Sequence, residues 1–278
     1  MRTATATLHV YCRGSAPQRV VFLGGLGSSY LEFHAMQARL LASGVSACTY
    51  DRAGGGWSEA STQAPLAQNA AAELLAALGE IGGAAKSVVL VAHSYGAMVA
   101  QAAAVLEQDR IGALVLLDPS YAEEIAVERP PPERLALLMP FLAPAGLLRL
   151  RSLFAFNEKD PAFPAEVRAE AAALAKQTRH MLAFGREIRS VRASSAWLAL
   201  HPLAFGAKPL MVIGRDGGGA TLAERHRYQR LLAKKSTQGR FEIAPGSDHF
   251  IHADAPDLVY QRIMAVAARV AQAQELNK

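Results

Sequence analysis

The 278-residue sequence predicts an α/β fold: a mostly parallel, doubly wound sheet with a helical cap inserted after the strand that ends at Asp118. Three observations predict it. Short runs that are apolar throughout recur along the chain, as in strands buried on both faces of a parallel sheet. Amphipathic segments separate most of these runs, as βαβ crossovers require. One long interval breaks this alternation and contains helical segments without a strand.

Six segments have the composition of buried strands. In chain order they are RVVFLG (19–24), VSACTY (45–50), SVVLVA (87–92), IGALVLLD (111–118), PLMVIG (209–214) and RFEIA (240–244). The N-terminal stretch MRTATATLHVYCRG also has strand character, because polar and apolar residues alternate along it. The Ala- and Leu-rich segments between the runs predict helices at 30–43, 66–80, 95–109, 220–235 and 256–275.

The interval 121–203 predicts the cap. It begins with a proline-rich stretch and continues into two helical segments, near 164–184 and 186–200. Both of its ends lead directly into core strands, which favours a cap over one end of the sheet rather than an independent domain. The expected division is a core of 1–120 and 204–278 and a cap of 121–203. The apolar cap residues are expected to line a pocket or, for most of them, to form buried helix faces; they are Leu137, Leu138, Met139, Phe141, Leu142, Phe154 and Phe156.

The composition excludes several classes of function. The net charge of +5 is modest, and the cluster AKKS (233–236) indicates a solvated helix end rather than a nucleic-acid patch. No run approaches the roughly 18 uninterrupted apolar residues of a membrane span. The N-terminus lacks the apolar stretch of a secretory signal. Neither an HExxH motif nor a Cys/His ligand spacing occurs, so no metal site is expected.

The two cysteines, Cys12 and Cys48, form no CxxC pair and lie far apart in the sequence. This arrangement does not suggest a disulfide framework, and a reducing compartment is the default expectation. A cytoplasmic protein that acts on a small molecule, without cofactor, nucleic acid or membrane, is therefore predicted. The oligomeric state is not indicated.

Ser94 is the first candidate for chemistry. It stands where a buried strand meets a helix, in LVAHSYGAMVA (90–100), with the small residues Ala92 and Gly96 two positions to either side. This pattern matches the nucleophile elbow G-x-S-x-G, with alanine in place of the first glycine. An ordinary helix N-cap serine is the alternative that the motif alone leaves open.

A serine nucleophile needs a histidine base and a carboxylate that orients it. His249 follows the last predicted strand on a Gly/Ser/Asp turn, a position that suits the base. His93 and His252 lie next to candidate residues in the sequence and are interpreted as structural. Asp118 and Asp216 compete for the acid, since each follows a strand. Asp118 is favoured because Pro119 fixes the chain as it leaves the strand, whereas Asp248 is interpreted as a surface turn residue.

Acyl transfer also requires backbone N–H groups directed at the developing oxyanion. One would come from Tyr95, which follows the candidate nucleophile. The other would come from the glycine-rich segment FLGGLGSS (22–29), where the N–H of Leu26 is the natural donor. A dinucleotide-binding interpretation of this segment is weak, because Tyr30 stands where a third glycine would be expected, and no Lys-Ser/Thr pair follows for a P-loop.

Taken in order, FLGGLGSS, YDRAGGGWS (50–58), LVAHSYGAMVA, LVLLDPS and GSDHFIHADAPDLV resemble the α/β-hydrolase superfamily, in particular its capped, esterase-like members. The resemblance covers nearly the whole chain outside the cap. It implies Ser94 as nucleophile, His249 as base and Leu26 and Tyr95 as oxyanion donors. Asp51 and Arg52 would brace a structural turn.

The sequence departs from the family pattern at three places. Gly24 stands where many relatives have histidine, Ala92 replaces the first elbow glycine, and Gly217 stands where the loop after 209–214 usually carries its acid. The last departure favours Asp118. A serine at the nucleophile position argues against haloalkane dehalogenase or epoxide hydrolase chemistry, which uses a carboxylate there.

The expected function is a serine hydrolase acting on a small, largely apolar ester or related carboxylic substrate. Serine-dependent acyl transfer, lactone opening and C–C bond cleavage share the same residues and stay open. A small-molecule binding protein or receptor with little turnover is the alternative from another class.

Overall fold

Seven strands form one sheet in the computed structural model, which describes residues 1–15, 19–81, 87–120, 141, 164–218 and 221–276. The strands are β1 (Val10–Arg13), β2 (Arg19–Leu23), β3 (Ser46–Tyr50), β4 (Val88–His93), β5 (Ile111–Leu117), β6 (Leu210–Arg215) and β7 (Gly239–Ala244). Their order across the sheet is β1-β3-β2-β4-β5-β6-β7. Only the β1–β3 pairing is antiparallel, and the other five pairings are parallel. The predicted mostly parallel, doubly wound sheet is confirmed.

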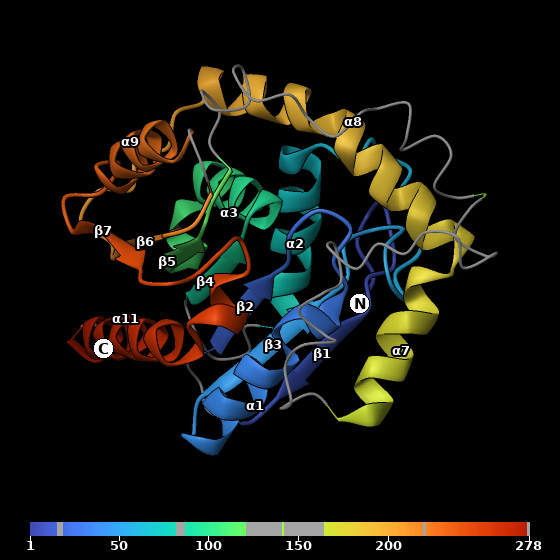
Figure 1. Cartoon of the computed structure of the whole chain (residues 1–278), viewed down its shortest axis with the longest axis horizontal. Helices are drawn as coiled ribbons and strands as arrows, with labels where there is room; N and C mark the ends of the chain where they lie inside the picture. The colour runs from blue at the N-terminus through green and yellow to red at the C-terminus, as the bar shows by residue number, and fades with distance from the viewer. Residues whose placement is uncertain (16–18, 82–86, 121–140, 142–163, 219–220, 277–278) are drawn as a thin grey trace.

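Helices cover both faces of the sheet (Figure 1). On one face α2 (Ala67–Ile81) and α3 (Tyr95–Leu106) pack against strand side chains such as Val21 and Leu90. On the other face α1 (His34–Ala42), which follows the 3-10 helix η1 (Tyr30–Phe33), and α11 (Pro256–Leu276) enclose a second apolar cluster. The strands are therefore apolar throughout because both of their faces are buried. The remaining short helices are η2 (Gln108–Arg110) and α10 (Ile251–Asp254), and α9 (Leu222–Ala233) packs beside β6 and β7.

The described part of the predicted cap consists of α7 (Ala165–Ala175) and α8 (Thr178–Leu200), and α8 packs against α2 and α3. Two segments near 164–184 and 186–200 were expected here, and that boundary is wrong. The chain forms one 23-residue helix through Gly185, because one glycine costs a helix only about 1 kcal/mol. Of the proposed pocket-lining residues, Phe141 is 78% exposed, and the others lie outside the described residues. The cap boundaries at 121 and 203 stay a prediction.

Cys12 and Cys48 form a disulfide between β1 and β3, which corrects the expectation of unpaired thiols. The two residues face each other directly across the antiparallel pair. Their separation of 36 residues in sequence was no obstacle, because β3 returns alongside β1. Disulfides are rare in reducing compartments, so Cys12 and Cys48 no longer support the expectation of a reducing compartment.

No helix in the described parts of the chain has both the length and the apolar character needed to cross a bilayer.

The sheet reverses its winding direction at β2, β3 and β4. From β2 the chain moves outward to β3 and then returns to place β4 on the other side of β2. The loops that follow β2 and β4 therefore diverge, the arrangement that typically opens a crevice at the carboxyl edge of such a sheet. Ser94 and the glycine-rich segment 22–29 both lie at this switch point.

Candidate functional site

Two backbone positions near the sheet edge are strained. Ser94 has φ of 51° and Asp118 has φ of 38°, and they are the only non-glycine residues with positive φ in the described part of the chain. Such conformations cost free energy and persist where the surrounding structure enforces them. Ser94 directly follows β4, and Asp118 directly follows the neighbouring strand β5. The strain therefore lies at the ends of two neighbouring strands, on two residues that the sequence predicted for the site.

The turn at Ser94 requires a glycine two residues later. A Cβ on Gly96 would lie 2.4 Å from the carbonyl oxygen of Leu23, so helix α3 begins in direct backbone contact with the end of β2. The Ser94 N–H donates to the carbonyl of Leu117, which fixes the turn against β5. Ala92 is fully buried within β4, so its methyl group is accommodated where the motif has glycine.

Ser94, His249 and Asp118 form one hydrogen-bonded chain. His249 Nε2 lies 3.1 Å from Ser94 Oγ, and His249 Nδ1 lies 2.6 Å from Asp118 Oδ2. Because an ionised carboxylate can only accept, Nδ1 carries the proton and Nε2 is left to accept the Ser94 proton. This is the arrangement in which a histidine can act as a general base toward a hydroxyl.

Asp118 is fully buried and held from two sides. Its second oxygen, Oδ1, accepts from Arg225 Nε at 2.7 Å and from Gln229 Nε2 at 2.9 Å, both on α9. Burial raises the pKa of Asp118, but the His249 hydrogen bond and the Arg225 cation outweigh it and hold that pKa well below its ordinary value. The carboxylate therefore stays ionised and fixed in orientation.

The competing aspartates lie elsewhere. Asp216 is exposed, and its Oδ2 accepts from the Gly246 N–H at 3.0 Å. Asp248 has a side chain that is 78% exposed, and it accepts from the His249 N–H rather than from the imidazole. Of the three carboxylates, the structure thus brings only Asp118 to the imidazole of His249.

The environment of His249 favours its neutral form. Burial lowers its pKa, the hydrogen bond to Asp118 opposes that shift, and the neighbouring His93 and Arg225 add to the lowering. A base must be neutral to accept a proton, so this balance keeps His249 available at ordinary pH.

Three N–H groups of the glycine-rich segment after β2 are held by protein acceptors. Gly25 N–H donates to Glu32, Gly27 N–H to Glu187 and Ser28 N–H to the Gly25 carbonyl. Within the described residues no protein acceptor faces the N–H of Leu26 or of Tyr95. These two groups are the ones predicted to bind an oxyanion.

A buried ion pair braces this loop from the β3–α2 connection and the cap. Arg52 Nε donates to Glu187 Oε1 at 2.6 Å, and its other nitrogens donate to the carbonyls of Gly24 and Gly25. Glu187 lies on α8, so the cap helix contributes directly to the loop. The neighbouring Asp51, also buried, accepts from the N–H groups of Tyr30 and Trp57. Both side chains make the bracing contacts that the resemblance implies.

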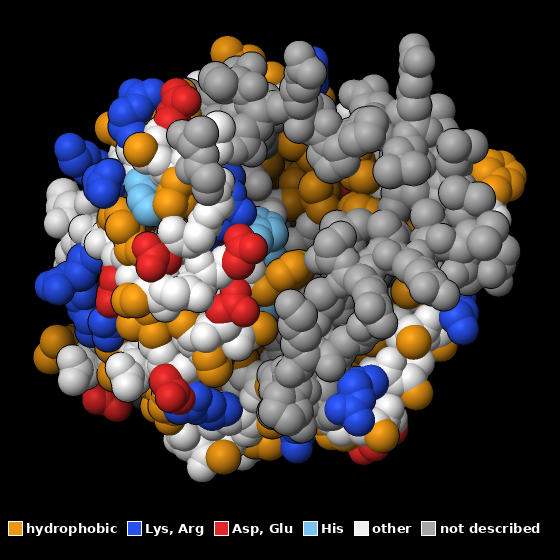
Figure 2. Space-filling view, in the orientation of Figure 1, with side chains coloured by type: hydrophobic (Ala, Val, Ile, Leu, Met, Phe, Trp, Pro, Cys, Tyr) orange, Lys and Arg blue, Asp and Glu red, His pale blue; other side chains and the backbone are white. Residues whose placement is uncertain are grey.

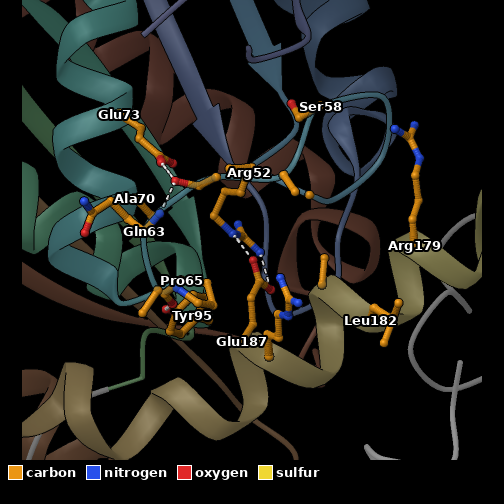
Figure 3. A pocket seen from close by; sticks show the side chains of 17 residues that line it. Arg52, Ser58, Gln63, Pro65, Ala70, Glu73, Tyr95, Arg179, Leu182 and Glu187 are labelled. Atoms are coloured by element: carbon orange, nitrogen blue, oxygen red, sulfur yellow. Dashed lines mark hydrogen bonds and ion pairs between the residues drawn. The ribbon is translucent and has the colours of Figure 1, made fainter. Parts of the chain in front are cut away.

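A cavity of about 200 Å³ lies between the β3–α2 connection and α8 (Figure 3). The Arg52–Glu187 pair and the side chain of Tyr95 form part of its wall, and Leu182 and Arg179 contribute from α8. Neither Ser94 nor His249 lines it. Arg52 thus lines this cavity while it also holds the glycine-rich loop.

Removing the charge of Glu187 is expected to destabilise the fold. In Glu187→Gln the buried Arg52 cation loses its counter-charge, and breaking such a pair costs about 3–5 kcal/mol. Urea denaturation measures the free energy of unfolding. The matched control is Glu242→Gln, because the Arg262–Glu242 pair has the same 2.6 Å contact but is about one-third exposed. A loss below about 1 kcal/mol is expected there. Equal losses in the two variants would contradict the bracing role of Glu187.

Three charged residues at the site were not found from the sequence. Arg225 holds Asp118, Glu187 holds the glycine-rich loop, and Glu32 accepts from the Gly25 N–H. Each is one charged residue in a predicted helix, where charge normally marks the solvent side. No motif distinguished them. Only the packing of α8, α9 and η1 onto the sheet edge shows that they face inward.

The sequence pattern of the Alpha/beta hydrolase family matches residues 20–262 of the chain. No curated protein matches the chain in sequence.

Solved structures of the same fold are similar over nearly the whole chain. A Pseudomonas aeruginosa protein, provisionally described as an epoxide hydrolase, is 18% identical with a TM-score of 0.75, covering 98% of this chain and 95% of that one. The enol-lactonase from Burkholderia xenovorans is 18% identical with a TM-score of 0.70, covering 95% and 97%. A thermophilic esterase from Thermogutta terrifontis is 18% identical with a TM-score of 0.64, covering 97% and 99%. At these identities the likeness shows the fold alone.

Proposed function

Because the chain belongs to the alpha/beta hydrolase family, we propose that it is a serine hydrolase that cleaves a small, largely apolar ester or related carboxylic substrate through an acyl-enzyme on Ser94. One observation carries the proposal: the continuous hydrogen-bonded chain from Ser94 Oγ through His249 to Asp118. Epoxide hydrolysis in this fold class would use a carboxylate nucleophile, whereas residue 94 is a serine.

The reaction proceeds in two halves. His249 Nε2 takes the proton of Ser94 as Oγ attacks the substrate carbonyl carbon, and the carbonyl oxygen becomes an oxyanion. His249 then gives this proton to the leaving alcohol oxygen as the C–O bond breaks, leaving an acyl group on Ser94. In the second half His249 takes a proton from water, the water oxygen attacks the acyl carbon, and Ser94 recovers its proton from His249 as the acid departs.

The N–H groups of Leu26 and Tyr95 stabilise the oxyanion in both halves. Their proposed role is supported by their position, one on each side of the crevice between β2 and β4, and by the bracing of the loop around Leu26. Removing one such donor typically costs about 100-fold or more in rate.

A hollow in the molecular surface supports the proposed substrate class. Figure 2 shows a hollow with hydrophobic side chains at its bottom and histidine side chains beside it. A small molecule with an apolar body fits such a surface. Two of the similar structures are by name an enol-lactonase and an esterase, and a lactone is a cyclic ester that the same two half-reactions open. No cofactor, nucleic acid or membrane is needed for this chemistry. A cytoplasmic location stays a prediction, and the Cys12–Cys48 disulfide removes one of its grounds.

The proposal is tested by the time course of p-nitrophenol release from short-chain p-nitrophenyl esters, mixed rapidly with the protein. An acyl-enzyme predicts a burst of about one p-nitrophenol per chain, followed by slower steady turnover, when deacylation limits the rate. Extending the acyl chain and offering lactones then defines the substrate. Release no faster than in buffer, together with tight binding of such molecules, would instead indicate a binding protein.

A further inference from the structure

A second buried polar cluster adjoins the proposed catalytic chain through His93 and takes no part in the reaction described above. It consists of Glu32, His93 and His252, whose side chains are each less than 5% exposed. Glu32 Oε1 lies 2.6 Å from His93 Nδ1 and 3.7 Å from His252 Nε2. A buried carboxylate is costly unless it is fully paired, so the contacts of this cluster show what keeps it in place.

Glu32 connects three loops of the site. Its Oε2 accepts from the Gly25 N–H at 2.9 Å and from the Ser28 hydroxyl, both in the glycine-rich loop. Its Oε1 meets His93, the residue before Ser94. His93 Nε2 in turn lies 2.9 Å from the carbonyl oxygen of His249. One side chain thereby links the proposed oxyanion loop, the strained serine turn and the loop of the base.

The two partners of His93 are both hydrogen-bond acceptors. A backbone carbonyl can only accept, so Nε2 must carry a proton. At Nδ1 the partner is a carboxylate that already receives the Gly25 and Ser28 protons, and an ionised carboxylate also only accepts. Burial raises the pKa of Glu32, but the charge and hydrogen bond of His93 outweigh it and lower that pKa to about 2. Both ring nitrogens of His93 thus face acceptors, and in the ion-pair form of the contact with Glu32 both carry protons.

The imidazole rings of His93 and His249 are close, with centroids 4.6 Å apart. A positive charge on His93 opposes the protonation of His249. The other groups that face His249 are Asp118, Arg225 and the exposed Asp248. Arg215 lies against both aspartates, 3.7 Å from Asp118 Oδ2 and 3.6 Å from Asp248 Oδ1. Burial lowers the pKa of His252 to about 3, so His252 is neutral and adds no charge to the cluster.

We propose that Glu32 is a positioning residue of the hydrolase: it forms a buried ion pair with His93 that ties the three loops together and holds a positive charge beside the base. The inference rests on the proposed function. A divalent cation is the competing explanation, since the ligand atoms of the three residues lie within 4.8 Å of one another. The Glu32–His93 contact of 2.6 Å favours a shared proton, because two ligands of a tetrahedral zinc ion lie about 3.3 Å apart.

The test is the pH dependence of Ser94 inactivation by a fluorophosphonate, which requires a neutral base and no knowledge of the natural substrate. In Glu32→Gln the amide can donate to His93 Nδ1, so His93 becomes neutral while the geometry is preserved. The acid limb of the inactivation rate is then expected to move to higher pH by about half a unit or more, because His249 no longer faces a cation. A merely structural role predicts a lower melting temperature with an unmoved limb.

Glu242→Gln is the matched control, because it removes one carboxylate of an ion pair between β7 and α11, which contain none of the three cluster residues. The acid limb of its inactivation rate is expected to coincide with that of the wild type. An unmoved limb in Glu32→Gln, with Ser94 still labelled, overturns the positioning role and leaves the hydrolase intact; no labelling of the wild type overturns the hydrolase itself. Stoichiometric metal in the purified protein would also overturn the ion pair.

Should Glu32→Gln not fold, imidazole ¹H–¹⁵N spectra of the wild type decide the question. Two bonded ring protons on His93 while His249 titrates are expected. A single ring proton on His93 throughout would contradict the proposal.

Discussion

Replacing Ser94 with alanine is expected to lower kcat for ester hydrolysis by about 10⁵- to 10⁶-fold, to the level that binding and the oxyanion donors alone provide. The reason is that no other hydroxyl stands at His249 Nε2 in the described part of the chain. The measurement is steady-state release of p-nitrophenol at saturating ester, with the melting temperature of the variant taken alongside.

The fold should tolerate this change. The only hydrogen bond of the Ser94 hydroxyl within the described residues is the one to His249, and the strained φ of 51° is set by the backbone contacts of Leu117 and Gly96. A folded Ser94→Ala protein that still turns over esters at an undiminished rate would show that the nucleophile lies elsewhere. If the variant binds apolar carboxylic compounds as tightly as a slow wild type does, a receptor is favoured.

Asp118→Asn is expected to lower kcat by about a thousandfold or more, because an amide donor in place of the carboxylate reverses the tautomer of His249. Nδ1 would then accept from the asparagine, and the proton would move to Nε2, which could no longer receive the Ser94 proton. Arg225 would also lose its counter-charge, so a lower melting temperature is expected as well. The measurement is kcat at a temperature where both proteins are folded.

Asp216→Asn is the matched control for this substitution. It makes the same chemical change on the next strand loop, where the carboxylate is exposed and bonds the Gly246 N–H. Little change in kcat is expected. A large loss in Asp216→Asn with a small one in Asp118→Asn would assign the acid to the other loop.

The central strands and their helices could be predicted because their sequences are locally consistent. The runs at 87–92 and 111–118 are apolar on both faces, and the structure has β4 at Val88–His93 and β5 at Ile111–Leu117. The turn between β4 and α3 could also be predicted, because the carbonyl oxygen of Leu23 lies too close to residue 96 for any side chain there, and the sequence has glycine. Where one segment determines its own structure, the sequence was sufficient.

Features that depend on two segments far apart in the sequence could not be predicted. The Cys12–Cys48 disulfide follows from the antiparallel pairing of β1 with β3, and neither cysteine carries a local sign of it. Glu32, Glu187 and Arg225 look like ordinary charged helix residues until η1, α8 and α9 are placed against the sheet edge. The boundary between the two cap helices was also misplaced: it was expected near residue 185, whereas α8 runs without a break from Thr178 to Leu200.

The most direct test of the proposed chemistry is fluorophosphonate labelling followed by peptide mapping. Trypsin releases Ser94 in the peptide Ser87–Arg110, and fragmentation of that peptide separates Ser94 from Ser87. A single adduct on Ser94, formed faster as the pH rises through the pKa of His249 and absent from Ser94→Ala, is the predicted result. An unmodified protein, or an adduct on another residue, would contradict the assignment of Ser94 as the nucleophile.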